Sequence, residues 1–107
     1  MAREIARGDI WNYTFKPPDK RRPVVILTRD SAIEFLGEIT VAPITSTVRD
    51  VPSEVLLTEA DGMARDCAVN LYHVQTVTKG RIGSLITTLS SRKFTEIRTA
   101  LLFALGF

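Results

Sequence analysis

Two short segments of this sequence bring groups that can bind a phosphate to the ends of predicted strands. In residues 21–27 (RRPVVIL), Arg22 precedes a proline, which favours extended backbone before it and is tolerated in sheets mainly at a strand start or an edge. In residues 39–46 (ITVAPITS), a proline interrupts the strand just before Thr45 and Ser46 present two hydroxyl groups. A guanidinium can hold two phosphoryl oxygens at once, and hydroxyls can donate to another. The two segments therefore predict an anion-binding site at one edge of a sheet.

Basic side chains are concentrated in the first third of the chain, which makes this end the candidate anion-binding end. The whole chain has 14 Lys and Arg against 12 Asp and Glu, a net charge of +2, so any contact with nucleic acid must be local. Lys16, Lys20 and Arg21 are candidates to contact a phosphate backbone. The alternating aromatic residues of segment 10–15 are more often core than stacking platforms, and Phe15, beside Lys16, is the best of them to stack on a base.

The chain contains one histidine, His73, and one cysteine, Cys67. A lone histidine is more often structural or exposed, but His73 would be a natural base if its strand ended at the same edge. Cys67 cannot form an internal disulfide and lies in an apolar segment, which predicts an inert buried thiol and a reducing cytoplasm. No cluster of His, Cys, Asp and Glu has the spacing of a metal site, so neither a metal nor another cofactor is expected.

Patterns of alternating or continuous apolar residues predict a series of short strands. These are residues 10–15, 23–28, 38–44, 54–57, 67–71 and 73–77, with 23–28 buried on both faces. Prolines, glycines and acidic residues interrupt the chain at 16–20, 47–52 and 59–63, and a further break is predicted at 79–83. Residues 31–37 are ambiguous between a helical turn and a loop.

After Ser90 the apolar residues recur at three- and four-residue spacing, which predicts a terminal helix. Ser90 or Ser91 can cap its start, and Gly106 can supply a left-handed stop. Short antiparallel strands followed by one helix predict a mainly β fold in one domain over residues 1–107, a small, partly open SH3-like barrel. The helix has more apolar residues than one core needs, so we expect a twofold homodimer. No apolar run approaches the roughly 20 residues of a membrane span, and no membrane contact is expected.

Several motifs in register give the chain a family resemblance over nearly its whole length. Residues 7–11 (RGDIW), 22–27 (RPVVIL), 41–46 (VAPITS) and 74–77 (VQTV), leading to 81–83 (RIG), resemble the MazF/PemK toxin family in order and spacing. The resemblance implies a homodimeric, metal-independent endoribonuclease toxin of a toxin–antitoxin pair, with the barrel shared by CcdB, MazF and PemK. Such enzymes cut single-stranded RNA at short sequences by attack of a 2′-hydroxyl, leaving a 2′,3′-cyclic phosphate and a 5′-hydroxyl. A cognate antitoxin with an acidic, disordered segment would neutralise the toxin.

The resemblance also implies roles for individual residues. The family's catalytic arginine falls on Arg22 and its catalytic threonine on Thr45, and Ser46 matches the residue that usually follows. Ser46, Lys20, Arg21, Phe15, Lys16 and His73 are then the candidates to contact RNA. The chain departs from the family pattern in two places: the loop at 16–20 is shorter than usual, and segment 72–76 (YHVQT) lacks the usual aspartate and has gained a histidine.

Two other functions remain open at the level of sequence. One is a gyrase-poisoning toxin of the CcdB type, whose aromatic-Gly-aliphatic tail is loosely matched in reverse by residues 105–107 (LGF). A glycine helix stop followed by a hydrophobic end residue is the simpler explanation of that tail. The other is a non-catalytic SH3-like module that holds RNA or a peptide on its basic edge. Arg22 and Thr45 at the strand ends favour the nuclease over both.

Overall fold

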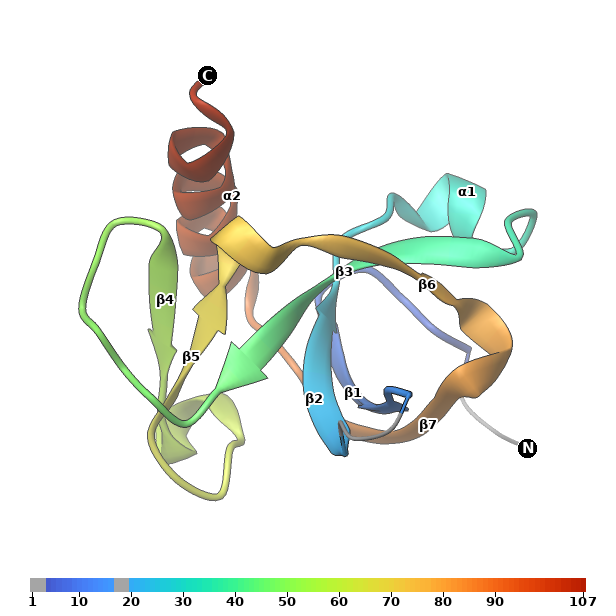
Figure 1. The fold of residues 1–107 in the computed structure, drawn as a ribbon, viewed down its shortest axis with the longest axis horizontal. Helices are drawn as coiled ribbons and strands as arrows, with labels where there is room; N and C mark the ends of the chain where they lie inside the picture. The colour runs from blue at the N-terminus through green and yellow to red at the C-terminus, as the bar shows by residue number, and fades with distance from the viewer. Residues whose placement is uncertain (1–3, 17–19) are drawn as a thin grey trace.

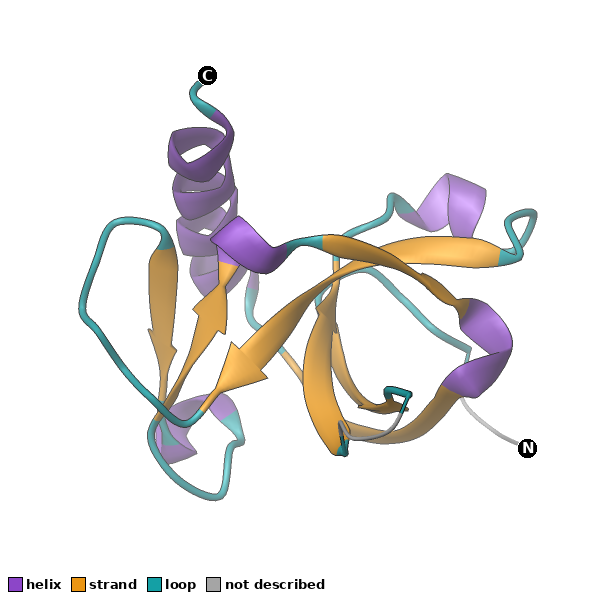
Figure 2. Cartoon of the chain, viewed as in Figure 1, coloured by secondary structure: helices purple, strands orange, loops and turns teal. Residues whose placement is uncertain are grey.

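The structure is a computed structural model that describes residues 4–16 and 20–107. Figures 1 and 2 show a curved sheet of short strands with one long helix beside it. The strands are β1 (Asp9–Thr14), β2 (Arg21–Ile26), β3 (Glu38–Thr45), β4 (Glu54–Leu57), β5 (Cys67–Asn70), β6 (Gln75–Thr78) and β7 (Ile82–Thr88). The helices are α1 (Asp30–Ile33) and α2 (Ser91–Leu105), with 3-10 turns η1 (Glu59–Asp61), η2 (Leu71–His73) and η3 (Lys79–Arg81). Within the described ranges, no helix is both long and apolar enough to cross a bilayer.

The strands form one antiparallel sheet that curls into a partly open barrel. Their order is β4-β5-β3-β2-β1-β7, and β6 pairs with β3 outside this path. β3 joins the two parts of the sheet, because its first half pairs with β6 and its end pairs with β5, where Ile44 lies opposite Val69. The predicted mainly β fold with a terminal helix is confirmed.

The central strands bury both of their faces. On β2, Val25 belongs to the core between the sheet and α2, whereas Val24 and Ile26 belong to the core inside the barrel. Successive side chains of a strand point to opposite faces, so a strand covered on both sides is apolar throughout. The predicted burial of this segment on both faces is confirmed, although the strand begins two residues earlier than predicted, at Arg21.

The aromatic residues of β1 are core residues, as the alternation favours. Trp11 and Tyr13 are buried inside the barrel, and Phe15 packs edge-on against Tyr13 with 4.8 Å between ring centroids. Asp9 is fully buried because its carboxylate accepts hydrogen bonds from the indole N–H of Trp11 at 3.1 Å and from the hydroxyl of Thr88 at 2.8 Å. The bond from Thr88 ties β1 to β7, and the bond from Trp11 lies within β1.

The terminal helix begins and ends where the sequence predicts. The Ser90 hydroxyl oxygen accepts the N–H of Lys93 at 3.1 Å, which caps the first turn. Gly106 adopts the left-handed conformation with φ +82°, and its N–H is directed to the carbonyl groups of Leu102 and Phe103. The helix packs Ile97 into the core against the sheet.

Two local predictions differ from the structure. No strand was expected between the break at 79–83 and the helix, yet β7 pairs with β1 along this segment. The segment predicted as a strand over 73–77 begins as the turn η2, and β6 starts only at Gln75. Asn70 causes this turn, because its side-chain carbonyl accepts the N–H of Tyr72 at 3.0 Å. Segment 31–37, which the sequence leaves open between a helical turn and a loop, contains both: it holds the end of α1, a single turn, followed by a loop.

Candidate active site

An open cavity of about 600 Å³ lies where β2 begins and β3 ends, a volume typical of small-ligand sites. Its lining comes from the start of β2, the end of β3, the loop after η1, the start of β5, and β7. The lining residues are Arg22, Pro23, Ile44, Thr45, Ser46, Thr47, Met63, Ala64, Arg65, Cys67 and Ile86. In Figure 1 the start of β2, the end of β3 and the η1 loop lie toward the lower side of the view. The cavity therefore brings together Arg22, Thr45 and Ser46, as the sequence predicts.

The register of β2 and β3 explains why Arg22 and Thr45 meet. Val24 lies opposite Pro43 in the last pair of this ladder. Continuing this register by two residues beyond the last pair gives Arg22 and Thr45 corresponding positions on one face, because side chains alternate with a period of two, and both line the cavity. Neither Pro43 nor Pro23 has an N–H to donate, so the ladder ends at this point. Thr45 pairs with β5 instead, and the two strands part around the cavity.

The Thr45 side chain is held in place by a local turn. Its Oγ1 accepts a hydrogen bond from the N–H of Thr47 at 3.1 Å. A threonine hydroxyl also has one hydrogen to donate, which leaves this group able to bind a ligand oxygen. A local turn and an anion-binding hydroxyl are thus compatible roles for Thr45. Ser46 is exposed in the same lining and offers a second hydroxyl.

The charged residues in the cavity lining, Arg22 and Arg65, are both arginines, and both are exposed. Within residues 4–16 and 20–107, neither makes an ion pair or a side-chain hydrogen bond. Among the same residues, no aspartate, glutamate or histidine lines the cavity. The cavity is therefore positively charged and suits an anion.

Cys67 is the third ionisable residue of the lining, and its predicted burial is confirmed. Burial raises the pKa of the Cys67 thiol, and the nearby carboxylates of Asp66 and Asp61 raise this pKa further. A thiol with a raised pKa is a poor nucleophile at neutral pH. Cys67 therefore contributes packing to the cavity and no charge.

The groups of the cavity can bind and stabilise an anion, but they supply no base. Guanidinium and hydroxyl donors aimed at phosphoryl oxygens stabilise charge that develops on them during a reaction. In the part of the chain that the structure describes, no three His, Cys, Asp or Glu side chains gather as a metal site would need. Proton transfer and metal binding are thus not provided by the described lining.

The other residues predicted to contact RNA do not line the cavity. Arg21 is exposed and precedes the cavity arginine in β2. Lys16 and Lys20 are exposed on either side of 17–19, the part of the predicted loop that falls outside the described residues. Phe15 is half-buried at the edge of the barrel core. Contacts between these side chains and RNA remain predictions.

His73 is not brought to the cavity. It is exposed in η2, where its Nδ1 lies 3.3 Å from the side-chain nitrogen of Asn70. β5 runs from Cys67, at the cavity, to Asn70, so η2 follows the opposite end of that strand. The condition for His73 to act as a base, a strand end shared with Arg22, is therefore not met within one chain.

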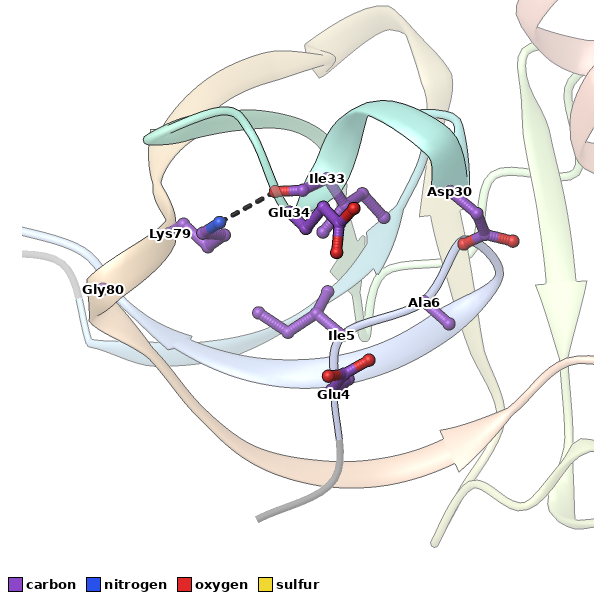
Figure 3. A pocket seen from close by; sticks show the side chains of 8 residues that line it. All are labelled: Glu4, Ile5, Ala6, Asp30, Ile33, Glu34, Lys79 and Gly80. Atoms are coloured by element: carbon purple, nitrogen blue, oxygen red, sulfur yellow. Dashed lines mark hydrogen bonds between the residues drawn. The ribbon is translucent and has the colours of Figure 1, made fainter.

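A larger cavity of about 890 Å³ lies on another side of the molecule, between α1, η3 and the start of the described chain (Figure 3). Glu4, Asp30 and Glu34 line it. The Lys79 ammonium, which could attract an anion, donates instead to the carbonyl oxygen of Ile33 at 2.8 Å. Three carboxylates beside one ammonium repel a phosphate. The smaller cavity is therefore the better candidate for chemistry on a phosphate.

Arg65 is the lining residue of interest that sequence reasoning missed. It lies between η1 and β5, in a segment with neither a strand pattern nor a motif that connects it to Arg22. Only the pairing of β5 with β3 carries this loop to the cavity. No local signal in the sequence could have placed it there.

Comparisons with known proteins agree with the sequence resemblance. A family model described as "PemK-like, MazF-like toxin of type II toxin-antitoxin system" matches residues 6–105. "Probable endoribonuclease MazF5" of Mycobacterium tuberculosis is 39% identical over 97 residues, which cover 90% of this chain and 88% of the relative. The solved structure of "Mycobacterium tuberculosis toxin MazF-mt6" has a TM-score of 0.85 at 31% identity and covers 92% of this chain and 97% of that one. "Endoribonuclease in complex with its cognate antitoxin from Mycobacterial species" has a TM-score of 0.86, covers 97% of each chain and, at 21% identity, supports the fold alone.

Proposed function

Because the chain belongs to the PemK-like, MazF-like toxins of type II toxin–antitoxin systems, we propose that it is an endoribonuclease that cleaves single-stranded RNA at short sequences. The reaction is metal-independent and begins with attack of a 2′-hydroxyl on the adjacent phosphorus. The observation that supports this most directly is the cavity lined by both Arg22 and Thr45, just beyond the last β2–β3 pair. Cleavage of cellular RNA would inhibit translation and growth.

In this proposal the scissile phosphate lies between Arg22 and Thr45. The 2′-oxygen bonds to phosphorus and the bond from phosphorus to the 5′-oxygen breaks, which gives a 2′,3′-cyclic phosphate and a 5′-hydroxyl. The Arg22 fork binds two non-bridging oxygens and the Thr45 hydroxyl donates to one of them, so that both stabilise the charge of the crowded intermediate. Neither group is a base at neutral pH. Water or a group outside the lining therefore accepts the proton of the 2′-hydroxyl. Water or such a group also supplies the proton that the leaving 5′-oxygen takes up.

Mapping the ends of cleaved bulk RNA tests the proposed function. The protein should produce 5′-hydroxyl and cyclic phosphate ends at one short sequence in excess EDTA, because the described residues provide no cluster of metal ligands. A 2′-deoxy substitution before the cut should block cleavage and leave binding largely intact. Activity that is lost in EDTA and restored by magnesium would contradict metal independence. Cutting of the deoxy substrate would mean a different reaction class.

A second copy of the chain is the first partner that we propose. α2 leaves several large apolar side chains exposed near its end, and covering them in a twofold dimer removes this area from water. They are Leu102, Phe103, Leu105 and Phe107, with exposed fractions of 38%, 52%, 59% and 89%. A dimer would also place two copies of the cavity on one particle.

An antitoxin with an acidic, disordered segment is the second proposed partner. Such a segment would fold as it binds and compete with RNA for the cavity arginines. Its affinity should fall when Arg22→Ala is combined with Lys20→Ala, and an unchanged affinity would contradict a shared site. The cytoplasm is the proposed setting, because the target is cellular RNA and the chain has a single cysteine.

The structure of the C-terminal tail gives no support to a gyrase-poisoning function. The N–H of Phe107 donates to the carbonyl of Leu102 at 2.9 Å, so residues 105–107 are explained as the end of a helix. A supercoiling assay beside the RNA assay separates these two functions. RNA binding without any cleavage would favour the non-catalytic module.

A further inference from the structure

We propose that Arg65 is a second phosphate-binding residue of this cavity and holds the RNA phosphate next to the one that is cleaved. The inference rests on the proposed endoribonuclease function and specifies how the substrate is held. Arg65 lines the same cavity as Arg22 but comes from a different part of the chain, the loop between η1 and β5. The guanidinium that binds the reacting phosphate cannot also bind the neighbouring phosphate. An RNA strand that crosses the cavity therefore needs a second cation for that phosphate, and Arg65 supplies it.

The first turn of the segment that leads to Arg65 is fixed by a capping box. The Thr58 hydroxyl oxygen accepts the N–H of Ala60 at 3.2 Å, and the Asp61 carboxylate accepts the N–H of Thr58 at 2.9 Å. Lys93 of α2 lies 3.9 Å from the same carboxylate. η1 is therefore tied to itself and to the terminal helix.

The residues after η1 are held against the body of the protein. Gly62 has a left-handed φ of +96°, and a Cβ on it would lie 2.8 Å from the Cβ of Thr87 on β7. Met63 is buried in the core under α2, and its N–H donates to the carbonyl of Thr58 at 3.3 Å. The backbone is thus positioned two residues before Arg65, although the Arg65 side chain is exposed. A cation on a positioned backbone loses less conformational freedom when it binds.

The charges around Arg65 leave it available to an anion. Asp66 follows it directly, yet in the described part of the chain no ion pair joins the two. Asp61, the other nearby acid, is occupied by Thr58 and Lys93. Two guanidinium groups in one cavity without a carboxylate repel each other, and a bound phosphate on each relieves that repulsion.

Binding of a non-cleavable RNA tests this role. The probe is an oligonucleotide that spans the mapped cut, with 2′-deoxyribose before it, and its affinity is measured at several salt concentrations. Arg65→Ala should weaken binding about tenfold, the scale of one charge-assisted hydrogen bond. It should also reduce the slope of log affinity against log salt by about 0.7, the value for one phosphate contact on a single strand. Turnover at saturating RNA should stay within about twofold.

Two further variants distinguish a phosphate contact from a general effect of charge or folding. Arg65→Lys should restore the salt slope and only part of the affinity, because lysine keeps the charge and loses the planar fork. Arg29→Ala removes an exposed arginine before α1, outside the cavity, whose side chain makes no cap hydrogen bond, and should leave affinity unchanged. An unchanged affinity and slope for Arg65→Ala, in a protein that cleaves RNA, would overturn only the role of Arg65. A protein that cleaves no RNA would overturn the proposed function itself.

Discussion

At the scale of single residues, removal of either the Arg22 or the Thr45 side chain should slow cleavage. Arg22→Ala should lower kcat by about 10²–10³, the scale for one preorganised donor at a developing oxyanion. Thr45→Ala should also lower kcat substantially, because it removes a donor and the acceptor that holds the Thr47 turn. Thr45→Ser keeps both functions of the hydroxyl and should retain most activity. Single-turnover cleavage of an RNA oligonucleotide measures all three.

Arg21 provides the matched control for Arg22. Both are exposed arginines at the start of β2, but only Arg22 lines the cavity. Arg21→Ala should therefore weaken RNA binding and reduce its salt dependence while turnover continues. An essential Arg21 beside a dispensable Arg22 would show that the assignment is one residue out of register.

The extent to which these residues could be predicted follows from how each reaches the site. Arg22, Thr45 and Ser46 lie near strand ends marked by prolines, which is a signal local to each segment. Arg65 is positioned by the long-range pairing of β5 with β3, and the sequence around Arg65 carries no pattern that predicts this pairing. The sequence predicts His73 on a strand, but the Asn70 side-chain oxygen accepts the N–H of Tyr72 and the chain turns there instead.

At the scale of elements, the strands that could be predicted are those with clear apolar patterns. β2 is apolar on both faces because two cores cover it. β7 has mostly exposed or half-buried side chains, and its register with β1 shifts near Trp11, so no period of two is visible in its sequence. Its pairing partner determines its structure, and the paired residues of β1 lie 69–79 positions earlier in the chain.

The η1 loop gives a prediction about stability with a matched pair of glycines. Gly62 and Gly106 both have positive φ, but a Cβ on Gly106 would meet nothing within 4 Å. Gly106→Ala should lower the free energy of unfolding by about 1–2 kcal/mol, the cost of left-handed backbone. Gly62→Ala should cost more, because the new methyl group also collides with Thr87. Urea unfolding measures both free energies. Equal losses would show that Thr87 moves away from the new methyl group at no cost in stability.

At the scale of the whole molecule, the C-terminal half of α2 is the surface that a second copy should cover. Light scattering at micromolar concentration should give twice the 11.9 kDa of one chain. Leu105→Glu should shift the mass toward one chain, because a buried, unpaired carboxylate in the interface is costly. Phe35→Glu is the control, since Phe35 is 79% exposed in the loop after α1, on the other side of the barrel from α2 in Figure 1. A monomer mass for the unmodified protein would contradict the dimer.

The burial of Trp11 makes the barrel optically distinguishable from the cavity. It is the only tryptophan of the chain, it is 6% exposed, and its indole N–H is bonded to Asp9. Among the described residues, none that lines the cavity belongs to the core around this ring. Tryptophan emission moves to longer wavelength when water reaches the indole, so a cavity variant that keeps the barrel should keep the native spectrum. The fluorescence of an inactive variant therefore tells whether it has lost its chemistry or its fold.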